Sequence, residues 1–154
     1  MKYSFDTSAF INPWKHYYRP HSFPRIWELV DSLIQKGEIV ASEMVLHELK
    51  VQKDDLLQWV VDREDNLIIR VDEEQQNIVI RIESDFPKFV NHQSPGRDYA
   101  DPFVIALAIQ HNLSVVTDET KPKKGTKIPD VCDFYNVGCI GYQEFLENIG
   151  YTDR

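Results

Sequence analysis

The chain has 154 residues, 42% of them hydrophobic, which is enough for the core of one domain. Its formal net charge of −8 excludes a protein that binds nucleic acid by bulk positive charge alone, but not a nuclease that gathers carboxylates around cations. No apolar stretch approaches the roughly 20 residues that span a bilayer, and the N-terminal run is too short for a signal peptide. We expect a single domain over residues 1–154 in the cytoplasm, without a membrane partner. Cys132 and Cys139 lack zinc spacing and are expected to be reduced.

The N-terminal segment predicts a first strand over residues 2–5 that ends on a carboxylate, Asp6. Pro13 and Pro20 are expected to enclose a loop further on, and its WKHYYRPH stretch mixes aromatic and basic side chains. Bases stack on aromatic rings and phosphates pair with lysine or arginine, so Trp14, Lys15 and Arg19 suit contact with single-stranded RNA. The alternative is that Trp14 and the neighbouring tyrosines pack this loop onto the body of the protein. Both interpretations fit the sequence.

An amphipathic helix is expected after this loop. Ser22 is placed to cap it, Pro24 lies in its first turn, and Gly37 ends it. Residues 39–41 then predict a second strand, and Ser42 is the expected cap of the helix that follows.

The helix after Ser42 carries two candidate acids, Glu43 and Glu48. Glu43 is nearer the strand end but lies on the polar side of the helix, whereas Glu48 lies on the apolar side, because residues three and four apart share a face. A carboxylate that faces a core needs a metal, an arginine or a raised pKa. The facing argument therefore favours Glu48 over Glu43 as the acid with a chemical role.

Three further elements are expected before the next acidic stretch, and none of them suggests chemistry. They are a helix over residues 56–62 capped by Asp54 or Asp55, an extended piece at residues 67–71, and a helix that begins at Asp72 and ends before Pro87.

The central stretch, residues 97–119, predicts a buried helix and a strand that ends on a carboxylate. Asp101 precedes Pro102, and proline is favoured at the first helical position, so Asp101 is an N-cap or first-turn residue. The run after it is apolar on every face, as in a helix packed on several sides. In a parallel sheet, this helix would start where the returning strand, residues 113–117, finishes. Asp101 and Asp118 would then share the edge at which open α/β sheets bind ligands.

The lysine-rich segment KPKKGTK follows almost directly after Asp118. Its Lys123 and Lys124 are placed to contact phosphate, and a solvated surface loop is the alternative. Beyond it we expect a helical turn, an edge strand over residues 137–140 and a last helix over residues 142–149.

Five acids fall at or near one predicted edge of the sheet: Asp6, Glu48, Asp101 and Asp118, with Asp98 as the fifth. Each alone has an ordinary explanation as a helix cap, a turn former or the end of a strand. Together they need a cation, because like charges side by side raise one another's pKa. Mg²⁺ and Mn²⁺ take oxygen ligands, and water bound to them can act as a nucleophile. The set therefore predicts a Mg²⁺ or Mn²⁺ site.

Motifs of several other enzyme classes are absent from the sequence, namely GxxxxGK[ST], GxGxxG, HExxH and GxSxG. A phosphatase of the haloacid-dehalogenase type would also place an aspartate after the first strand, but it would need a second aspartate where Ser8 stands. A catalytically silent module with the same fold, which binds RNA or regulates, is the remaining alternative. Retention of four acids counts against it.

Four acidic motifs, FDTSAFI, VLHELK, DPFVIALA and VVTDE, stand in order along nearly the whole chain. In order and spacing they resemble the motifs of PIN-domain ribonucleases, and the chain is similar to the small VapC-like nucleases of toxin-antitoxin pairs. The resemblance implies an α/β, PIN-like three-layer fold with a twisted parallel sheet of about four or five strands and helices on both sides. It also implies Mg²⁺- or Mn²⁺-dependent hydrolysis of RNA phosphodiester bonds.

The resemblance further assigns roles to individual residues. Metal binding and catalysis fall to the acids of the four motifs, Asp6, Glu48, Asp101 and Asp118. Thr7 and Ser8 match the small hydroxyl positions after the first aspartate, where a hydroxyl can hold a ligand carboxylate or a water. Asp98 is expected to be a cap or an outer residue of the site.

Partners follow from the same resemblance. RNA is the implied substrate, and an antitoxin protein would cover the acidic edge, with an inserted arginine or lysine. A homodimer is expected, since it is the commonest closed assembly of soluble proteins and PIN relatives suggest it too. The WKHYYRPH and KPKKGTK segments are longer than the usual connections of the small toxins and border the expected site, so substrate preference does not carry over.

Overall fold

The computed structural model describes residues 1–89, 99–119 and 126–152. Three of the candidate residues, Asp98, Lys123 and Lys124, lie outside these ranges, so their expected roles stay predictions.

The secondary structure alternates between strands and helices, as the sequence predicts. The strands are β1 (Tyr3–Phe5), β2 (Ile39–Ser42), β3 (Ile68–Ile69), β4 (Ser114–Val116) and β5 (Cys139–Ile140). The helices are α1 (Thr7–Asn12), the π-helix η1 (Pro13–Tyr17), α2 (Pro24–Gln35), α3 (Glu43–Leu49), α4 (Asp55–Val61), α5 (Glu64–Leu67), α6 (Glu73–Asp85), α7 (Asp101–His111), α8 (Ile128–Tyr135) and α9 (Tyr142–Asn148).

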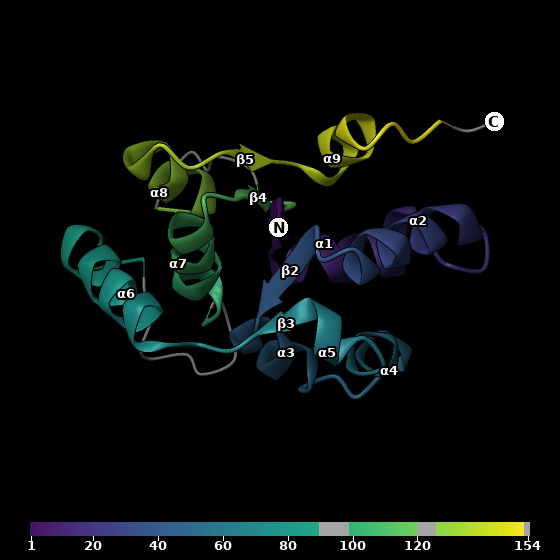
Figure 1. Ribbon diagram of the computed structural model, residues 1–154, viewed down its shortest axis with the longest axis horizontal. Coiled ribbons are helices and arrows are strands. Elements are labelled where there is room, and N and C mark those ends of the chain that lie inside the picture. Colours follow the sequence, from purple (N-terminus) through teal and green to yellow (C-terminus); the bar gives the residue numbers. More distant parts are fainter. Residues whose placement is uncertain (90–98, 120–125, 153–154) are drawn as a thin grey trace.

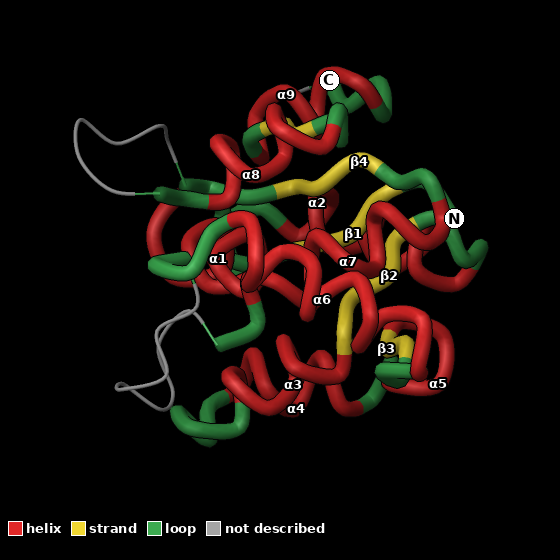
Figure 2. The backbone as a smooth tube through the Cα atoms, turned by 90° about the vertical axis from the view of Figure 1, so that its left-hand side faces the viewer, coloured by secondary structure: helices red, strands yellow, loops and turns green. Residues whose placement is uncertain are grey.

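Within the described ranges the strands form one five-stranded sheet in the order β3-β2-β1-β4-β5, and every pairing is parallel. Helices cover both faces: α7 lies against β1, β2 and β4 with α6 packed outside it, and α2 lies on the other side (Figure 1). Figure 2 views the molecule from the side of α6 and α7. The predicted α/β architecture, with a parallel sheet between helical layers, is confirmed.

The helix α7 is buried on all sides, as its uninterrupted apolar sequence predicts. Every residue from Val104 to Ala108 is buried. The hydroxyl of Ser4 in β1, itself buried, donates to the carbonyl of Val104 at 3.0 Å. This bond fixes the first turns of α7 over the central strand, and with them the start of the helix, where Asp101 lies.

Several expected helix caps are present. The Ser42 side chain accepts from the amide of Met44 at the start of α3, and Asp54 accepts from the amide of Leu57 in α4. Asp72 likewise caps α6. These bonds satisfy amide groups that a helix leaves without partners at its N-terminus.

The structure differs from the sequence prediction after Asp6. The loop expected between Pro13 and Pro20 begins as the π-helix η1, because α1 runs directly into it and Pro13 lies in its first turn, where its missing N–H costs nothing. The predicted cap at Ser22 is wrong. The amides of Ser22 and Phe23 both donate to the carbonyl of Arg19, and this turn delays the start of α2 to Pro24. The short helix α5 was not expected.

The strand order places a ligand-binding crevice at a defined position. From β1 the chain continues to β2 and β3 on one side of the sheet, and β4 and β5 lie on the other side. The carboxyl ends of β1 and β4 therefore flank the point at which the order reverses, and open α/β sheets bind ligands at such a point. None of the helices in the described parts of the chain has the length and hydropathy needed to cross a membrane.

Candidate metal centre at the sheet edge

Three carboxylates meet at this reversal point and are called the acidic centre here: Asp6, Asp101 and Glu119. One oxygen from each lies within 4.8 Å of the others. Asp6 directly follows β1, Asp101 is the first residue of α7, and Glu119 stands shortly after β4. Asp6 and Asp101 are buried, at 2% and 4% exposed, and Glu119 is half-buried.

Two hydroxyl groups hold the Asp6 carboxylate in place. Ser8 donates to its Oδ2 at 2.7 Å, and Thr117 donates to the same oxygen at 2.9 Å. Burial raises the pKa of Asp6 above its ordinary value, and these hydrogen bonds offset only part of that shift. Without a cation, burial therefore disfavours the charged form of the Asp6 carboxylate, although Ser8 and Thr117 fix its position.

A turn after β4 brings Glu119 into the acidic centre. The Oγ1 of Thr117 accepts from the amide of Glu119 at 3.1 Å, which closes a turn of the kind that serine and threonine form with the residue two positions on. The Glu119 carboxylate then accepts from the amide of Ile128, at the first residue of α8, at 3.3 Å. Thr117 thus contacts both Asp6 and Glu119.

Asp118, the acid that the sequence analysis selected after β4, lies elsewhere. Its Oδ2 accepts from the side-chain amide of Asn12 at 2.7 Å, and its backbone N–H donates to the Ser8 hydroxyl at 2.9 Å. Glu119 is not among the site residues that the sequence predicts. The signal that points to it is Thr117, because a hydroxyl residue at a strand end favours a turn that brings back the second residue after it.

The two acids of α3 separate as the facing argument expects. The Oε1 of Glu48 accepts from the amide of Ala100 at 2.6 Å, so Glu48 reaches the residue before Asp101. The Oε1 of Glu43 accepts from the amide of Val71 at 2.7 Å, beyond β3. Glu48 is therefore next to the acidic centre, although it does not belong to the three carboxylates that meet there.

Of the two hydroxyl groups in α1, only that of Ser8 hydrogen-bonds within the acidic centre as far as the structure describes it. Its hydroxyl lies between Asp6 and the amide of Asp118. The Thr7 hydroxyl is buried and has no hydrogen-bond partner among the described residues.

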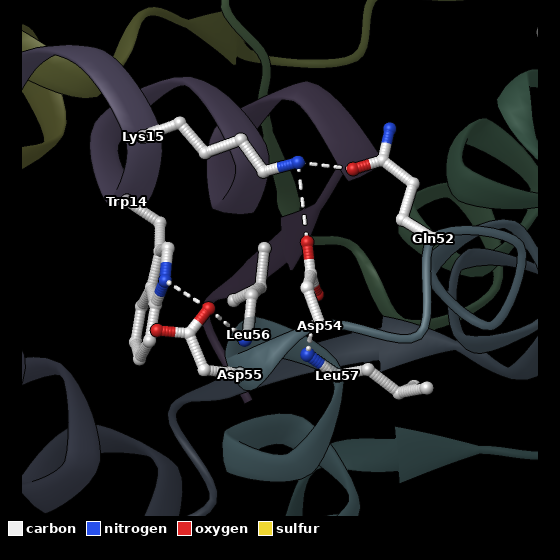
Figure 3. Close-up of polar contacts among 7 residues, drawn as sticks. All are labelled: Trp14, Lys15, Gln52, Asp54, Asp55, Leu56 and Leu57. Carbon is white, nitrogen blue, oxygen red and sulfur yellow. Dashed lines mark hydrogen bonds and ion pairs between the residues drawn. The ribbon is translucent and has the colours of Figure 1, made fainter.

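Trp14 and Lys15 fasten η1 to the start of α4 (Figure 3). The indole N–H of Trp14 donates to Asp55 at 3.2 Å, and its ring packs against Trp27 and Trp59, with centroids 4.9 and 5.8 Å away. The ammonium of Lys15 lies 3.1 Å from Asp54 and also donates to the side chain of Gln52.

These contacts fit the packing interpretation of the two side chains. The Nε of Arg19 donates to the carbonyl of Lys15 at 2.9 Å, so it too has a contact within the segment. Contact of Trp14, Lys15 and Arg19 with RNA stays a prediction.

The donors of the acidic centre suit a hard divalent cation. All three are carboxylate oxygens, the ligand type that Mg²⁺ and Mn²⁺ prefer over nitrogen or sulfur. Burial raises the pKa of Asp6, so the hydrogen bonds to its carboxylate offset only part of the cost of burying its charge. A divalent cation would offset the rest, so the residues fit such an ion.

Comparison with known proteins extends the fold assignment. No curated protein matches the sequence. Among solved structures, a chain in the crystal structure of VapBC2 from Rickettsia felis bound to a DNA fragment from their promoter is 17% identical, with a TM-score of 0.55 over 92% of this chain and 98% of that one. A chain in FitAcB from Neisseria gonorrhoeae is 21% identical, with a TM-score of 0.54 over the same shares.

A chain in a toxin-antitoxin complex from Klebsiella pneumoniae is 14% identical, with a TM-score of 0.50 over 82% of this chain and 94% of that one. Identities this low establish a shared fold only. Residues 3–152 match the family model of DUF4411, described as a domain of unknown function. The chain therefore belongs to the DUF4411 family and has the PIN-like fold that the sequence resemblance implied.

Proposed function

We propose that this protein is a metal-dependent endoribonuclease that acts in the cytoplasm as the toxin of a toxin-antitoxin pair. The observation that carries the proposal is the acidic centre, in which three carboxylates lie within 4.8 Å of one another. Its position at the reversal point of a parallel sheet supports a role in binding and chemistry. The likeness in fold to chains of toxin-antitoxin complexes supports the biological setting.

In this proposal Asp6, Asp101 and Glu119 hold Mg²⁺ or Mn²⁺. The bound ion would supply Lewis-acid activation of the scissile phosphate and of the attacking water. Ser8 and Thr117 orient the Asp6 carboxylate through hydroxyl groups at 2.7 and 2.9 Å. Such outer contacts matter, because their loss typically lowers metal affinity or activity by roughly 10–100-fold.

Glu48 and Asp118, which the sequence resemblance assigns to the metal, take other roles in this proposal. Glu48 fixes the start of α7 through the amide of Ala100 and so positions Asp101. Asp118 accepts from Asn12 and lines a cavity.

An antitoxin protein is the proposed partner in the absence of RNA. It would cover the acidic edge and place an arginine or lysine near the three carboxylates, since an acidic group attracts a cationic side chain. We also propose a homodimer, the commonest closed assembly of soluble proteins.

The test is cleavage of a mixed pool of structured and single-stranded RNAs with Mn²⁺ or with EDTA. Wild type is compared with Asp6→Asn and Asp101→Asn, and Asp65→Asn, an exposed acid in α5, is the matched control. The proposal expects Mn²⁺-dependent cleavage that EDTA abolishes and that is lost in both centre variants but kept in the control. If wild type and variants all bind RNA equally well and leave it intact, the nuclease is rejected in favour of a catalytically silent RNA-binding module.

A further inference from the structure

We propose that a cavity beside the acidic centre binds one unpaired base of the RNA, so that the protein acts on single-stranded substrate. The cavity, called the tyrosine cavity here, has a volume of about 490 Å³ and is lined by His16, Tyr17, Tyr18, Asp118, Tyr142 and Gln143. This inference rests on the proposed function, because the base must belong to the RNA whose phosphate reaches the acidic centre.

The tyrosine cavity is joined to the acidic centre through a short chain of hydrogen bonds. Asp118 lines the cavity, and its backbone N–H donates to the Ser8 hydroxyl at 2.9 Å. That hydroxyl donates in turn to Asp6 at 2.7 Å. A nucleotide with its phosphate at the acidic centre would therefore have a neighbouring base within reach of this cavity.

The walls offer aromatic faces for stacking. Tyr17 is 56% exposed and offers the open ring, whereas the half-buried ring of Tyr18 packs against Tyr142, with centroids 5.8 Å apart at an angle of 33°. Aromatic side chains with accessible faces are the usual platforms for bases of single strands, because every base has a π-face. The exposed side chains of His16 and Gln143 add groups that can hydrogen-bond to a base edge.

Tyr142 also provides an unused hydrogen-bond donor in the cavity wall. Its side chain is only 3% exposed, and its hydroxyl has no hydrogen-bond partner among the residues that the structure describes. Buried hydroxyl groups normally have a partner, and this one is available to a bound base once a small shift of the cavity wall exposes it. Burial, and to a smaller extent Tyr18, raise the pKa of Tyr142, which keeps the hydroxyl protonated at neutral pH.

Charge and size favour a base over a phosphate or a duplex. The residues that line the cavity include Asp118 and, among those described, neither lysine nor arginine, so a phosphate group would be repelled. The volume lies within the roughly 300–1,000 Å³ of typical small-molecule sites. A base inside a duplex is stacked and paired, and it cannot enter such a cavity unless it is splayed out.

The segment that lines the cavity has two functions along its length. Trp14 and Lys15 hold η1 against α4, while His16, Tyr17 and Tyr18 turn towards the cavity. π-helical turns are rare and are often found at functional sites. The contacts to α4 thus fix the platform that presents the two tyrosines.

The experiment measures binding, not cleavage, in the Asp6→Asn background. The probes are fluorescein-labelled oligouridine and oligoadenosine of about ten nucleotides, a length within the range of known single-strand sites, together with a duplex of the two. Each single strand is also made as a series with one abasic nucleotide moved along it. The variants are Tyr17→Ala and Tyr17→Trp, and Phe134→Ala, an exposed aromatic residue in α8 outside the cavity, is the control.

We expect Tyr17→Ala to weaken binding of at least one single strand about tenfold, Tyr17→Trp to retain it, and the control to leave it unchanged. In the protein that retains Tyr17, an abasic nucleotide at one position of the strand should weaken RNA binding. In Tyr17→Ala, the same abasic nucleotide should weaken RNA binding no further. The inference is overturned if no abasic position matters, if the abasic loss persists in Tyr17→Ala, or if the duplex binds as tightly as the strands. Binding and cleavage are measured separately, so the two proposals can fail separately. If the protein cleaves RNA but no abasic position weakens binding, only the base-binding cavity is rejected. If the protein binds RNA as expected but does not cleave it, only the nuclease activity is rejected.

Discussion

Asp6 is a buried carboxylate of the acidic centre, and its burial affects the stability of the folded protein. Its carboxylate is 2% exposed and accepts two hydroxyl hydrogen bonds, yet burial still raises its pKa. A folded state that binds the Asp6 proton more tightly than the unfolded chain loses stability as the pH rises from the ordinary aspartate pKa through the raised one. Without a bound cation, the charged form of this buried carboxylate therefore lowers the stability of the folded protein at neutral pH.

Asp6→Asn tests this effect of the buried charge on stability. Asparagine keeps an acceptor for Ser8 and Thr117 but carries no charge, so the melting temperature in EDTA at neutral pH should rise by a few degrees. Mn²⁺ is expected to raise the melting temperature of wild type, and this gain should disappear in the variant. Thermal unfolding with and without Mn²⁺ measures both effects, and Asp65→Asn should alter neither. A lower melting temperature with an intact Mn²⁺ gain would refute this role of Asp6.

A second comparison at the residue scale separates the two consecutive acids after β4. Glu119 lies within 4.8 Å of Asp6 and Asp101, whereas the Asp118 carboxylate accepts from Asn12. Glu119→Gln should weaken Mn²⁺ binding, measured by calorimetry, by about 100-fold, and Asp118→Asn should change it by less than about threefold. The reverse order of effects would assign the ligand role to Asp118, as the motif resemblance alone suggests.

The ends of the elements carry the site. Asp6 follows β1, Asp101 begins α7, and Glu119 follows β4, so three separate elements must be held in register. Hydrogen bonds between elements do this: Ser4 to Val104 joins β1 to α7, and Glu48 to Ala100 joins α3 to the residue before α7.

Glu48 tests whether α3 acts through α7 or through the metal itself. Glutamine can still accept from the amide of Ala100, so Glu48→Gln should retain cleavage within several-fold of wild type. Glu48→Ala leaves that amide without its acceptor and should reduce cleavage roughly 10–100-fold. Metal-dependent RNA cleavage rates for both variants provide the measurement. Equal loss in both would show that the carboxylate charge, and hence direct metal binding, is what matters.

At the contact between η1 and α4, two substitutions of Asp54 separate its helix cap from its ion pair. Asp54 caps α4 through the amide of Leu57 and pairs with Lys15 at 3.1 Å. Asp54→Asn keeps the cap and should cost less than about 1 kcal/mol of unfolding free energy, since the pair is partly exposed. Asp54→Ala loses both and should cost roughly 1 kcal/mol more. Urea unfolding distinguishes the two variants, and equal losses would contradict the cap.

The pH dependence of the same pair has a definite sign. Burial acts to raise the pKa of Asp54, but the hydrogen bond from the Leu57 amide and the charge of Lys15 outweigh it, so the pKa is lowered. The stabilisation is therefore complete above the ordinary aspartate pKa and is lost as the pH falls through the lowered value. The difference in unfolding free energy between wild type and Asp54→Ala, measured by urea unfolding, should therefore become smaller at acidic pH.

At the scale of the whole molecule, the elements that define the sheet could be predicted from local sequence. The β-branched runs of β2 and β4 and the uniformly apolar α7 are visible in the sequence, and so are Asp6 and Asp101, because a strand end and an Asp-Pro helix start are local signals. That Asp6 and Asp101 lie at the same edge of the sheet follows from the parallel topology alone.

The parts that could not be predicted depend on contacts between distant segments. Trp14 meets Trp27 and Trp59 only in the folded chain, so no local signal predicts η1 within the expected loop. Glu119 enters the centre because Thr117 bonds to Asp6 across the sheet and turns the chain, and spacing alone does not rank it above Asp118.

We propose that Asp6, Asp101 and Glu119 share one divalent cation. Diffraction from a crystal soaked in Mn²⁺, measured at the manganese absorption edge, locates the ion independently of any activity. A shared ion would give an anomalous peak bonded to oxygens of all three carboxylates. A peak held by Asp118 in place of Glu119, or no peak among the three at saturating Mn²⁺, would refute the shared site.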